Sequence, residues 1–345
     1  MQPSRQADGL VKLGARCFAL SLPLLAFITL YVILDPFRVV RQHDNYYVGA
    51  GRVMLNRDFV SLQMFEKNFP RYRYDSFILG NSRSIFYEWN DWSKYIGSDK
   101  IFHFDASSES LLGIDLKLKY LDRRCAIDNC LIILDGSALG IVTNQDGHIF
   151  TKHYRLSGQN QMAFQMKFFK AFIDKHFLRA YLDLRWHHRF RPSMGEVLDP
   201  RVWDYDAAHN ELSLHSTIEA EIERGRYYQE KAGLFPLRDH VKRNAPAVIG
   251  SRQMQLLTEM REILGRQKSN YRVVISPLYD QVSLAPADAE ALRKIFGADK
   301  VSDFSGVNEL TSRSENYYES SHYRPVVSRA IMSKIYTENA LRVSR

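Results

Sequence analysis

The sequence predicts an α/β fold on a parallel sheet, preceded by one transmembrane helix and interrupted by a mostly helical insertion. Three observations predict it: short apolar runs that alternate with helical patterns, an uncharged run near the N-terminus, and a long interval that breaks this alternation. Strands that alternate with helices form a parallel sheet with helices on both faces.

Near-continuous apolar runs such as LIIL and VVI are typical of strands buried on both faces. The predicted strands are 74–79, 100–105, 129–135, 271–276 and 301–304. Helical spacing of apolar residues between these runs predicts helices. The predicted helices are 110–124, 251–267 and 286–296. A chain of 345 residues that is 45% hydrophobic is long enough to bury a sizeable core.

The uncharged run covers residues 17–34 and ends at Asp35-Pro36. A run of this length is near the minimum that spans a bilayer. A cleaved signal would have a shorter apolar core and a small-residue cleavage site after it. We therefore predict an uncleaved anchor, with a short tail over 1–16 before it and a lead-in over 35–71 after it.

Basic residues flank the run on both sides, so the charge rule for orientation is nearly balanced. We expect a single-pass protein of the cytoplasmic (inner) membrane, with its large domain in the periplasm or at the cell exterior, on the functional grounds below. The net charge of +8 comes without a Lys/Arg block or a recognition motif, which argues against nucleic acid as a partner. An anionic membrane surface or an acidic glycan accounts for the charge as well.

The α/β domain is assigned to residues 72–137 and 251–345, and residues 138–250 to the insertion or cap. Within the insertion, 162–186 is predicted as a long aromatic-rich helix and 219–231 as a second helix. The insertion either has its own small core, or covers the active site, or docks a membrane partner.

A candidate nucleophile follows the first predicted strand. The apolar run ends at Gly80, and Ser82 comes two residues later. Open α/β sheets carry their chemistry at the carboxyl ends of the strands. A tight turn there places a hydroxyl at a helix N-terminus, where free N–H groups can hold an oxyanion. We predict that Ser82 is a nucleophile. The alternative is that it caps the next helix, and Ser84 is its main rival.

The candidate base lies near the other end of the chain. Glu319 and His322 are three residues apart in a polar segment that precedes a last helix over 326–336. A serine nucleophile needs a base that is held by a third group. We predict that His322 is the base and that Glu319 orients it, the alternative being a surface histidine. The sequence contains no metal-ligand spacing, Walker loop or dinucleotide fingerprint, so no metal or cofactor is expected.

The segments FILGNSRS (77–84) and YYESSHY (317–323) resemble the first and last blocks of the SGNH/GDSL hydrolase superfamily. They look most like its membrane-anchored branch, which includes the D-alanyl transfer protein of teichoic acids and alginate acetylation proteins. The resemblance covers about 72–135 and 271–336. It implies a three-layer, flavodoxin-like SGNH domain. It also implies that Ser82 is the catalytic serine, and that Glu319 and His322 stand for the family's Asp-x-x-His.

The middle blocks of the family match less closely. The resemblance implies that a backbone N–H of Ser107 or Ser108 contributes to the oxyanion hole. The family's Gly-x-Asn-Asp is replaced here by Leu134–Ser137, which lacks the asparagine, so that Asp135 or Ser137 would line the site instead. These departures leave a weakened or non-catalytic relative as an open alternative.

The resemblance implies an O-acyltransferase or esterase, with acetyl as the favoured acyl group and an envelope or exported polysaccharide as the substrate. A multi-pass acyltransferase is a candidate partner. The alternatives are a non-catalytic scaffold or glycan-binding subunit of a modification or export complex, and a lipase-like esterase. Cys125 and Cys130 either pair in an oxidising compartment or remain reduced thiols.

Overall fold

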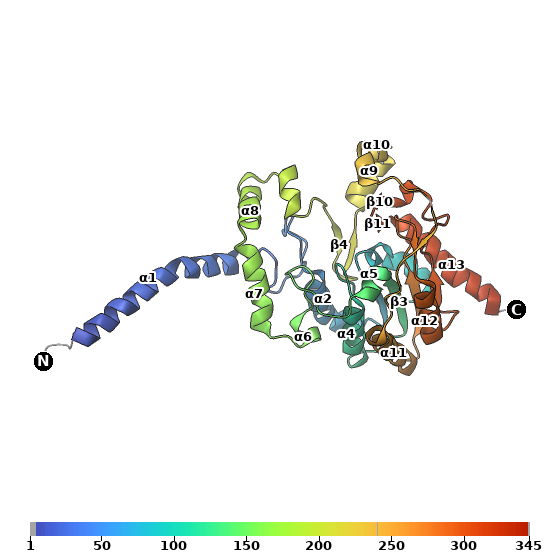
Figure 1. Ribbon diagram of the computed structural model, residues 1–345, viewed down its shortest axis with the longest axis horizontal. Coiled ribbons are helices and arrows are strands. Elements are labelled where there is room, and N and C mark those ends of the chain that lie inside the picture. The colour runs from blue at the N-terminus through green and yellow to red at the C-terminus, as the bar shows by residue number, and fades with distance from the viewer. Residues whose placement is uncertain (1–4, 240, 344–345) are drawn as a thin grey trace. The chain divides into compact units, whose positions relative to one another are not determined.

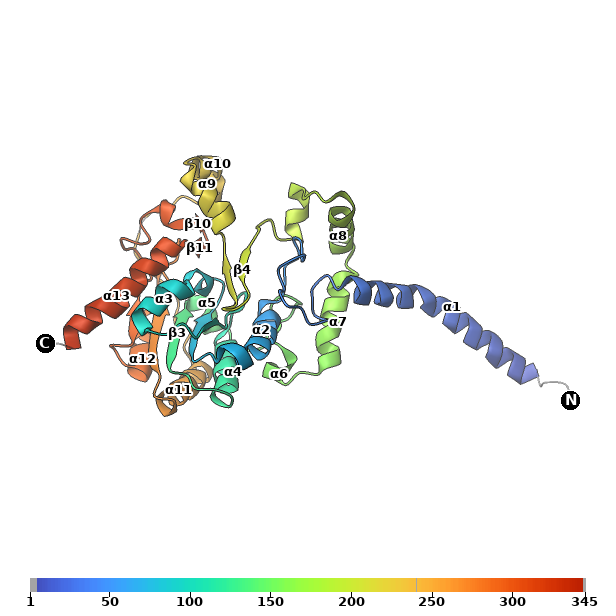
Figure 2. The same cartoon turned by 180° about the vertical axis from the view of Figure 1, so that it is seen from behind.

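The computed structural model describes residues 5–239 and 241–343. The chain forms two compact units. Unit 1 comprises Met1–Leu55 and Gln161–Pro200, and unit 2 comprises Asn56–Asn160 and Arg201–Arg345. Figures 1 and 2 show the elements of each unit from opposite sides.

Unit 2 is built on a five-stranded parallel sheet, as the sequence predicts. Its strands, in spatial order, are β2 (Ile101–His103), β1 (Ser76–Gly80), β3 (Asn129–Leu134), β7 (Asn270–Ile275) and β9 (Val301–Asp303). The sheet grows from β1 to β2 in one direction and from β3 onwards in the other. Ligands of open α/β sheets bind at such a switch point, outside the carboxyl ends of the strands.

Helices flank the sheet in two groups. α4 (Leu111–Asp122), α11 (Ser251–Arg266) and α12 (Pro286–Phe296) pack side by side, and α3 (Trp89–Ile96) packs against α13 (Pro325–Val343). Crossovers between parallel strands are right-handed, which puts these two groups on opposite faces of the sheet. Figure 2 shows α3 and α13 from their own side of the sheet. The predicted α/β alternation is therefore confirmed.

α2 (Arg57–Tyr72), within the predicted lead-in, belongs to the core of unit 2. Asn56 caps it by accepting a hydrogen bond from the Phe59 N–H at 2.8 Å. The Phe65 ring lies 6.1 Å from that of Phe77 and 5.6 Å from that of Phe102, so the helix covers β1 and β2. These aromatic contacts tie the start of unit 2 to the strand that carries the candidate nucleophile.

Short elements complete unit 2. The turns are 3₁₀ turns at Ser84–Phe86, Ala232–Leu234 and Ser314–Asn316 and a π turn at His215–Glu219. The short helices are α5 (Gly136–Gly140), α6 (Tyr154–Ser157), α9 (Ala220–Glu223) and α10 (Tyr227–Glu230). The two-stranded pairs are β4 (Asp204–Asp206) with β5 (Glu211–Ser213), β6 (Arg243–Asn244) with β8 (Val282–Ser283), and β10 (Tyr317–Glu319) with β11 (His322–Tyr323). The predicted helix over 219–231 is thus two separate turns, with Gly225 between them at a φ of +83°.

Unit 1 contains α1 (Arg5–Leu34), α7 (Gln161–Phe172), α8 (Lys175–His187) and a 3₁₀ turn at Pro192–Glu196. The predicted single helix over 162–186 is wrong, because the chain breaks at Asp174. The carboxylate of Asp174 accepts hydrogen bonds from His176 N at 3.0 Å and Phe177 N at 3.1 Å and starts α8 as its N-cap.

The apolar part of α1, Leu13–Leu34, has a mean hydropathy of 2.4 and is 6% buried. By length and composition it can cross a membrane. The predicted tail over 1–16 begins in residues 1–4, outside the described part of the chain, and is helical from Arg5 onwards. Asp35 ends α1, and its carboxylate accepts hydrogen bonds from Val39 N at 2.9 Å and Val40 N at 3.1 Å.

The cysteines are free thiols. Cys130 is buried in β3, and burial raises its pKa. The Cys125 Sγ donates to the Leu121 carbonyl at 3.6 Å, at the end of α4. Of the two alternatives raised by the sequence, the structure has the unpaired one.

Candidate active site

The turn after β1 depends on a glycine. Gly80 has a φ of +155°, and a Cβ on it would lie 2.7 Å from the Ile133 carbonyl oxygen and 2.9 Å from the Ser84 Cβ. A side chain would clash there in a conformation that L-residues rarely adopt. The chain can therefore turn out of the sheet directly at the end of β1, which brings Ser82 to its carboxyl edge.

Ser84, the alternative to Ser82 as nucleophile, uses its hydrogen bonds within this turn. It is fully buried, and both its N–H, at 2.8 Å, and its Oγ, at 2.7 Å, donate to the Asn81 carbonyl. The half-buried Ser82 side chain points elsewhere, to a histidine from the other end of the chain. Of the two serines, Ser82 is the one whose hydroxyl contacts a base.

The partner histidine lies on a hairpin formed by β10 and β11, in which Glu319 and His322 are cross-strand neighbours. The His322 Nε2 lies 2.8 Å from the Ser82 Oγ. Its Nδ1 is hydrogen-bonded to the Glu319 Oε1, whose second oxygen accepts from the Ser321 N–H at 2.6 Å. An ionised carboxylate can only accept, so Nδ1 carries the proton and Nε2 is left to accept from the serine hydroxyl.

The electrostatics of Glu319 favour its charged form. Partial burial opposes ionisation, but the hydrogen bond and the charge of His322, with the Ser321 N–H and the charge of Arg201, outweigh it and lower the pKa of Glu319 below its usual value. Glu319 is therefore ionised throughout the neutral range. An ionised carboxylate on Nδ1 both fixes the tautomer of His322 and stabilises the imidazolium that would form when it takes a proton.

Arg83, which the sequence reasoning missed, links the serine turn to the hairpin. Its Nε donates to the Ser321 carbonyl at 3.0 Å, and its NH1 donates to Asp135 Oδ2 at 2.7 Å. The same Asp135 oxygen accepts from the Asn81 Nδ2 at 2.6 Å. The residues on either side of Ser82 are thus held by one buried carboxylate, which fixes the turn that carries the hydroxyl. The only sequence signal was an arginine directly after the serine.

Asp135 and Ser137, predicted to line the oxyanion site, are joined to each other. Asp135 caps α5 by accepting from Ser137 N at 2.9 Å and Ala138 N at 3.0 Å, and the Ser137 hydroxyl also donates to it. Burial raises the pKa of Asp135, but Arg83 and these donors outweigh burial and lower it. An ionised carboxylate has no proton to donate, so Asp135 positions neighbours of Ser82 rather than stabilising an oxyanion.

Ser107 and Ser108, the other predicted oxyanion residues, lie in the loop after β2. The loop is tied to the end of β1, because the Ala106 N–H donates to the Gly80 carbonyl at 3.2 Å. Ser108 has a φ of +50° and is exposed, and Ser107 is half-buried. The loop therefore passes beside the strand end that precedes Ser82, although within the described residues no hydrogen bond joins these serines to Ser82.

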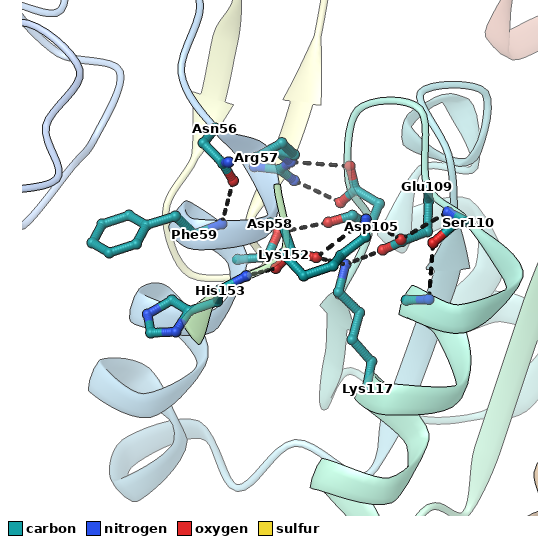
Figure 3. Close-up of polar contacts among 12 residues, drawn as sticks. Asn56, Arg57, Asp58, Phe59, Asp105, Glu109, Ser110, Lys117, Lys152 and His153 are labelled. Carbon is teal, nitrogen blue, oxygen red and sulfur yellow. Dashed lines mark hydrogen bonds and ion pairs between the residues drawn. The ribbon is translucent and has the colours of Figure 1, made fainter. Parts of the chain in front are cut away.

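A buried ionic cluster holds both ends of this loop (Figure 3). Its members are Arg57, Asp58, Asp105, Glu109, Lys117 and Lys152, each with a side chain no more than 3% exposed. Asp105 and Glu109 stand at the two ends of the segment that contains Ser107 and Ser108. Three cations face three carboxylates, so the cluster is balanced in charge.

The two ends of the loop are held differently. Arg57 binds Asp105 through two parallel hydrogen bonds, at 3.0 Å from Nε and 2.8 Å from NH2. Glu109 forms ion pairs with both Lys117 and Lys152. A Cβ at Gly113 would lie 2.0 Å from the Glu109 Oε1, so the helix below the loop needs glycine at this position. The loop is therefore anchored to α2 and α4 by charges that water cannot reach.

The hairpin is braced by residues that the sequence had assigned to the insertion. Glu219 binds Arg324 through Nε at 3.0 Å and NH2 at 2.6 Å, and accepts from the Tyr318 hydroxyl at 2.7 Å. The Tyr227 hydroxyl donates to the Tyr318 carbonyl at 2.7 Å. These contacts flank Glu319 and His322 on both sides. No local sequence pattern predicts these contacts, because the partners are about a hundred residues apart.

Among the described residues, no group of three His, Cys, Asp or Glu side chains is arranged to hold a metal ion. Compared with protein-family models and with curated proteins, the chain matches none.

Proposed function

We propose that this protein is a membrane-anchored serine enzyme of acyl esters, with an SGNH-like, three-layer flavodoxin-type domain. Its reaction is O-acyl transfer or ester hydrolysis, with acetyl as the favoured group, on an envelope or exported polysaccharide. One observation carries the proposal: Ser82, His322 and Glu319 form a continuous hydrogen-bonded chain at the carboxyl edge of a parallel sheet. The spatial order of the strands supports the fold assignment.

The geometry assigns each group a step. Ser82 Oγ attacks the acyl carbonyl carbon as its proton passes to His322 Nε2. The tetrahedral intermediate then expels the alcohol, which takes the proton from His322, and leaves an acyl ester on Ser82. A sugar hydroxyl or water then gives a proton to His322 and attacks this ester. The second tetrahedral intermediate expels the Ser82 Oγ, which takes that proton back from His322. The N–H groups of Ser82 and of Ser107 or Ser108 are the proposed oxyanion donors.

The location follows from the anchor and the substrate. Through the apolar part of α1 the chain would span the cytoplasmic membrane once, with the large domain in the periplasm or at the cell exterior. A multi-pass acyltransferase in the same membrane is the proposed source of acyl groups. A topology reporter fused to the C-terminus that is active only in the cytoplasm would overturn this location and, with it, the polysaccharide substrate.

A fluorophosphonate probe on the full chain in detergent tests the enzyme. We expect labelling of the wild type and none of Ser82→Ala. Ser321→Ala is the matched control, because it removes an exposed hydroxyl from the same hairpin and leaves the Ser321 backbone contacts to Arg83 and Glu319 in place. Equal labelling of wild type and Ser82→Ala would refute the assignment of the nucleophile.

A second function, a non-catalytic scaffold or glycan-binding subunit, is favoured by one observation. The carboxylate of Asp135 is fully engaged where a donor asparagine is expected by resemblance. Absence of labelling, together with full complementation by Ser82→Ala in cells, would establish this alternative. Activity on a lipid ester but not on an acetylated oligosaccharide would instead indicate a lipase-like esterase.

A further inference from the structure

α7 of unit 1 has apolar side chains on two opposite faces. Phe164, Phe168 and Phe172 recur at every fourth position and are fully buried. On the opposite face lie Met162, which is 71% exposed, and Met166, which is 44% exposed. A surface helix of a water-soluble protein normally has one apolar stripe, and a helix that is apolar all round normally contacts something other than water on every side. The outer face of α7 therefore exposes apolar side chains although its inner face is already buried.

α8 also exposes apolar side chains on its outer face. Leu182 and Trp186 are one helical turn apart, and their side chains are 43% and 84% exposed. The inner face of the same helix buries Phe177 and Tyr181. A tryptophan is costly to leave in water, but its amphipathic ring is favoured at the interface between lipid and water.

Positive charge is concentrated in the segment that contains these two helices. Residues 161–191 contain seven lysines and arginines and two aspartates, a net charge of +5 out of +8 for the whole chain. Lys170, Lys175 and Arg179 are exposed. On α8, Arg179 lies one turn before Leu182 and Lys175 lies one turn before Arg179, so the cations border the apolar side chains. Basic and aromatic residues that border an apolar face are typical of helices that lie on an anionic membrane.

Unit 1 places these helices at the end of α1. Tyr31, three residues before the end of α1, packs its ring 5.6 Å from that of Phe169 and 5.4 Å from that of Phe172. By helical spacing, Phe169 belongs to the outer face of α7, with Met162 and Met166. The end of α1 therefore packs against α7 beside that outer face. Figures 1 and 2 show α1 leaving α7 and α8, which run across its direction.

We propose that α7 and α8 lie flat on the anionic phospholipid surface of the membrane that α1 crosses. The outer faces of the two helices and the link between them are what we call the α7–α8 platform. Its members are Met162, Met166 and Phe169 on α7, Ile173 in the link, and Leu182 and Trp186 on α8. In this arrangement the platform contacts the lipid headgroup region, and Lys170, Lys175 and Arg179 neutralise headgroup phosphates. The inference rests on the proposed anchoring through α1 and is independent of the chemistry at Ser82.

Lipid is favoured over a protein partner on two grounds. The platform begins at the point where α1 would leave the bilayer, so lipid headgroups are its nearest available neighbours. The net charge of +5 complements a surface of anionic headgroups, and many small charge contacts add up without a shaped groove. A membrane protein that covers the platform is the competing outcome of the test below.

The test uses the full chain in nanodiscs, with brominated phospholipids that quench tryptophan fluorescence on contact. Trp89, Trp92 and Trp203 belong to unit 2, so the signal of Trp186 is the difference between wild type and Trp186→Phe. In anionic discs we expect bromolipid to quench the wild type clearly more than Trp186→Phe. The variant Lys170→Glu/Arg179→Glu reverses two charges, so it should weaken docking by roughly 30-fold or more and remove the difference.

Arg293→Glu/Lys294→Glu is the matched control, because it makes the same change in charge on exposed positions of α12 in unit 2. It should keep the quenching of the wild type. Equal quenching of wild type and Trp186→Phe overturns the proposal. The same result, combined with capture of one membrane protein by a photo-crosslinker at position 186, would assign the platform to a protein partner.

Two further readouts distinguish the platform from the proposed membrane anchor and from the proposed serine enzyme. Release of the wild type from membranes by alkaline carbonate would refute the anchor itself, whereas retention without quenching of Trp186 refutes only the platform. Fluorophosphonate labelling of Trp186→Phe should equal that of the wild type, whatever the location of the platform.

Discussion

The two units depart in opposite ways from the usual pattern of a water-soluble domain, in which charged side chains are exposed and apolar side chains are buried. Unit 2 buries the six charged side chains of the ionic cluster, and unit 1 exposes the apolar side chains of the α7–α8 platform. A buried charge persists only when it is paired, and here three cations face three carboxylates. An exposed apolar surface persists where its neighbour is not water. The first arrangement holds the loop after β2, and the second supports the proposed contact of unit 1 with the membrane.

This contrast predicts that changes in unit 2 affect chemistry and stability, while changes on the platform affect only the contact with the membrane. The largest effect is expected at Glu319. Glu319→Gln removes the charge that fixes the tautomer of His322 and stabilises its protonated form. We expect kcat/KM on an acetyl ester to fall about 10³-fold or more, while the protein stays in the carbonate-resistant membrane fraction.

Glu315→Gln is the control for this change. It removes the same charge from the exposed Glu315, just before the hairpin, and should leave kcat/KM within about twofold. Comparable losses in the two variants would mean that general acidity near the hairpin, and not the contact with His322, supports activity.

The ionic cluster should respond strongly to the loss of one member. Lys117→Met leaves Glu109 and Asp58 with one cation fewer in a site that water does not reach. We expect the free energy of unfolding to fall by about 3–5 kcal/mol, measured by urea denaturation in detergent. Lys334→Met, on an exposed part of α13, should change it by less than about 0.5 kcal/mol. A small effect of Lys117→Met would show that the cluster relaxes or admits water.

The same cluster predicts a plateau in stability between acid and alkaline limits. Burial opposes the charge of Asp105, but Arg57 outweighs it and lowers its pKa below the ordinary 3.8. Its contribution is therefore complete above about pH 4 and is lost as the pH falls through the folded value. Burial likewise opposes the charge of Lys117, but Glu109 and Asp58 raise its pKa above the ordinary 10.5. Its contribution is complete below that pH and is lost as the pH rises through the folded value.

Urea midpoints measured from pH 2 to 11 check this plateau. The double variant Arg57→Met/Asp105→Leu removes the pair as a unit, so its stability should fall less steeply than that of the wild type between pH 4 and pH 2. Parallel curves for the two proteins would show that other carboxylates control acid unfolding.

The smallest effect is expected on the platform. Met166→Ser replaces an exposed side chain of α7 and should change the free energy of unfolding by no more than about 0.5 kcal/mol. Phe168→Ala, two residues away on the buried face, should lower it by about 3–5 kcal/mol. A large loss for Met166→Ser would mean that the platform is covered by the protein itself, which would remove the contrast between the units.

The sequence predicted the elements whose pattern is local. All five strands of the sheet overlap the predicted apolar runs, and helices form where apolar residues recur at helical spacing. The break at Asp174 escaped prediction, because the aromatic periodicity continues across it and a single capping carboxylate decides where α8 begins. Local hydrophobic pattern reports which face is buried, and it says little about where a helix is interrupted.

The residues of the candidate site likewise fall into those that a local pattern predicted and those that depend on distant partners. Ser82, Glu319 and His322 were predicted because each lies in a short motif at the end of an element. Arg83 and Glu219 were missed, since their roles depend on partners at Ser321 and Arg324, far along the chain. Asp135 was predicted as a site residue, but only its partners indicate that it holds the serine turn.

By itself, the sequence determined a parallel α/β sheet, one apolar helix near the N-terminus, and a serine and a histidine at opposite ends of one domain. The tertiary structure decided that the Ser82 Oγ and His322 Nε2 lie 2.8 Å apart, and that six scattered charges neutralise one another beside the loop after β2. It also decided that Met162 and Met166 of α7 remain exposed. The reason is physical. Strands and helices arise from hydrogen bonds and burial between near neighbours, whereas pairing and exposure depend on segments that meet only when the chain has folded.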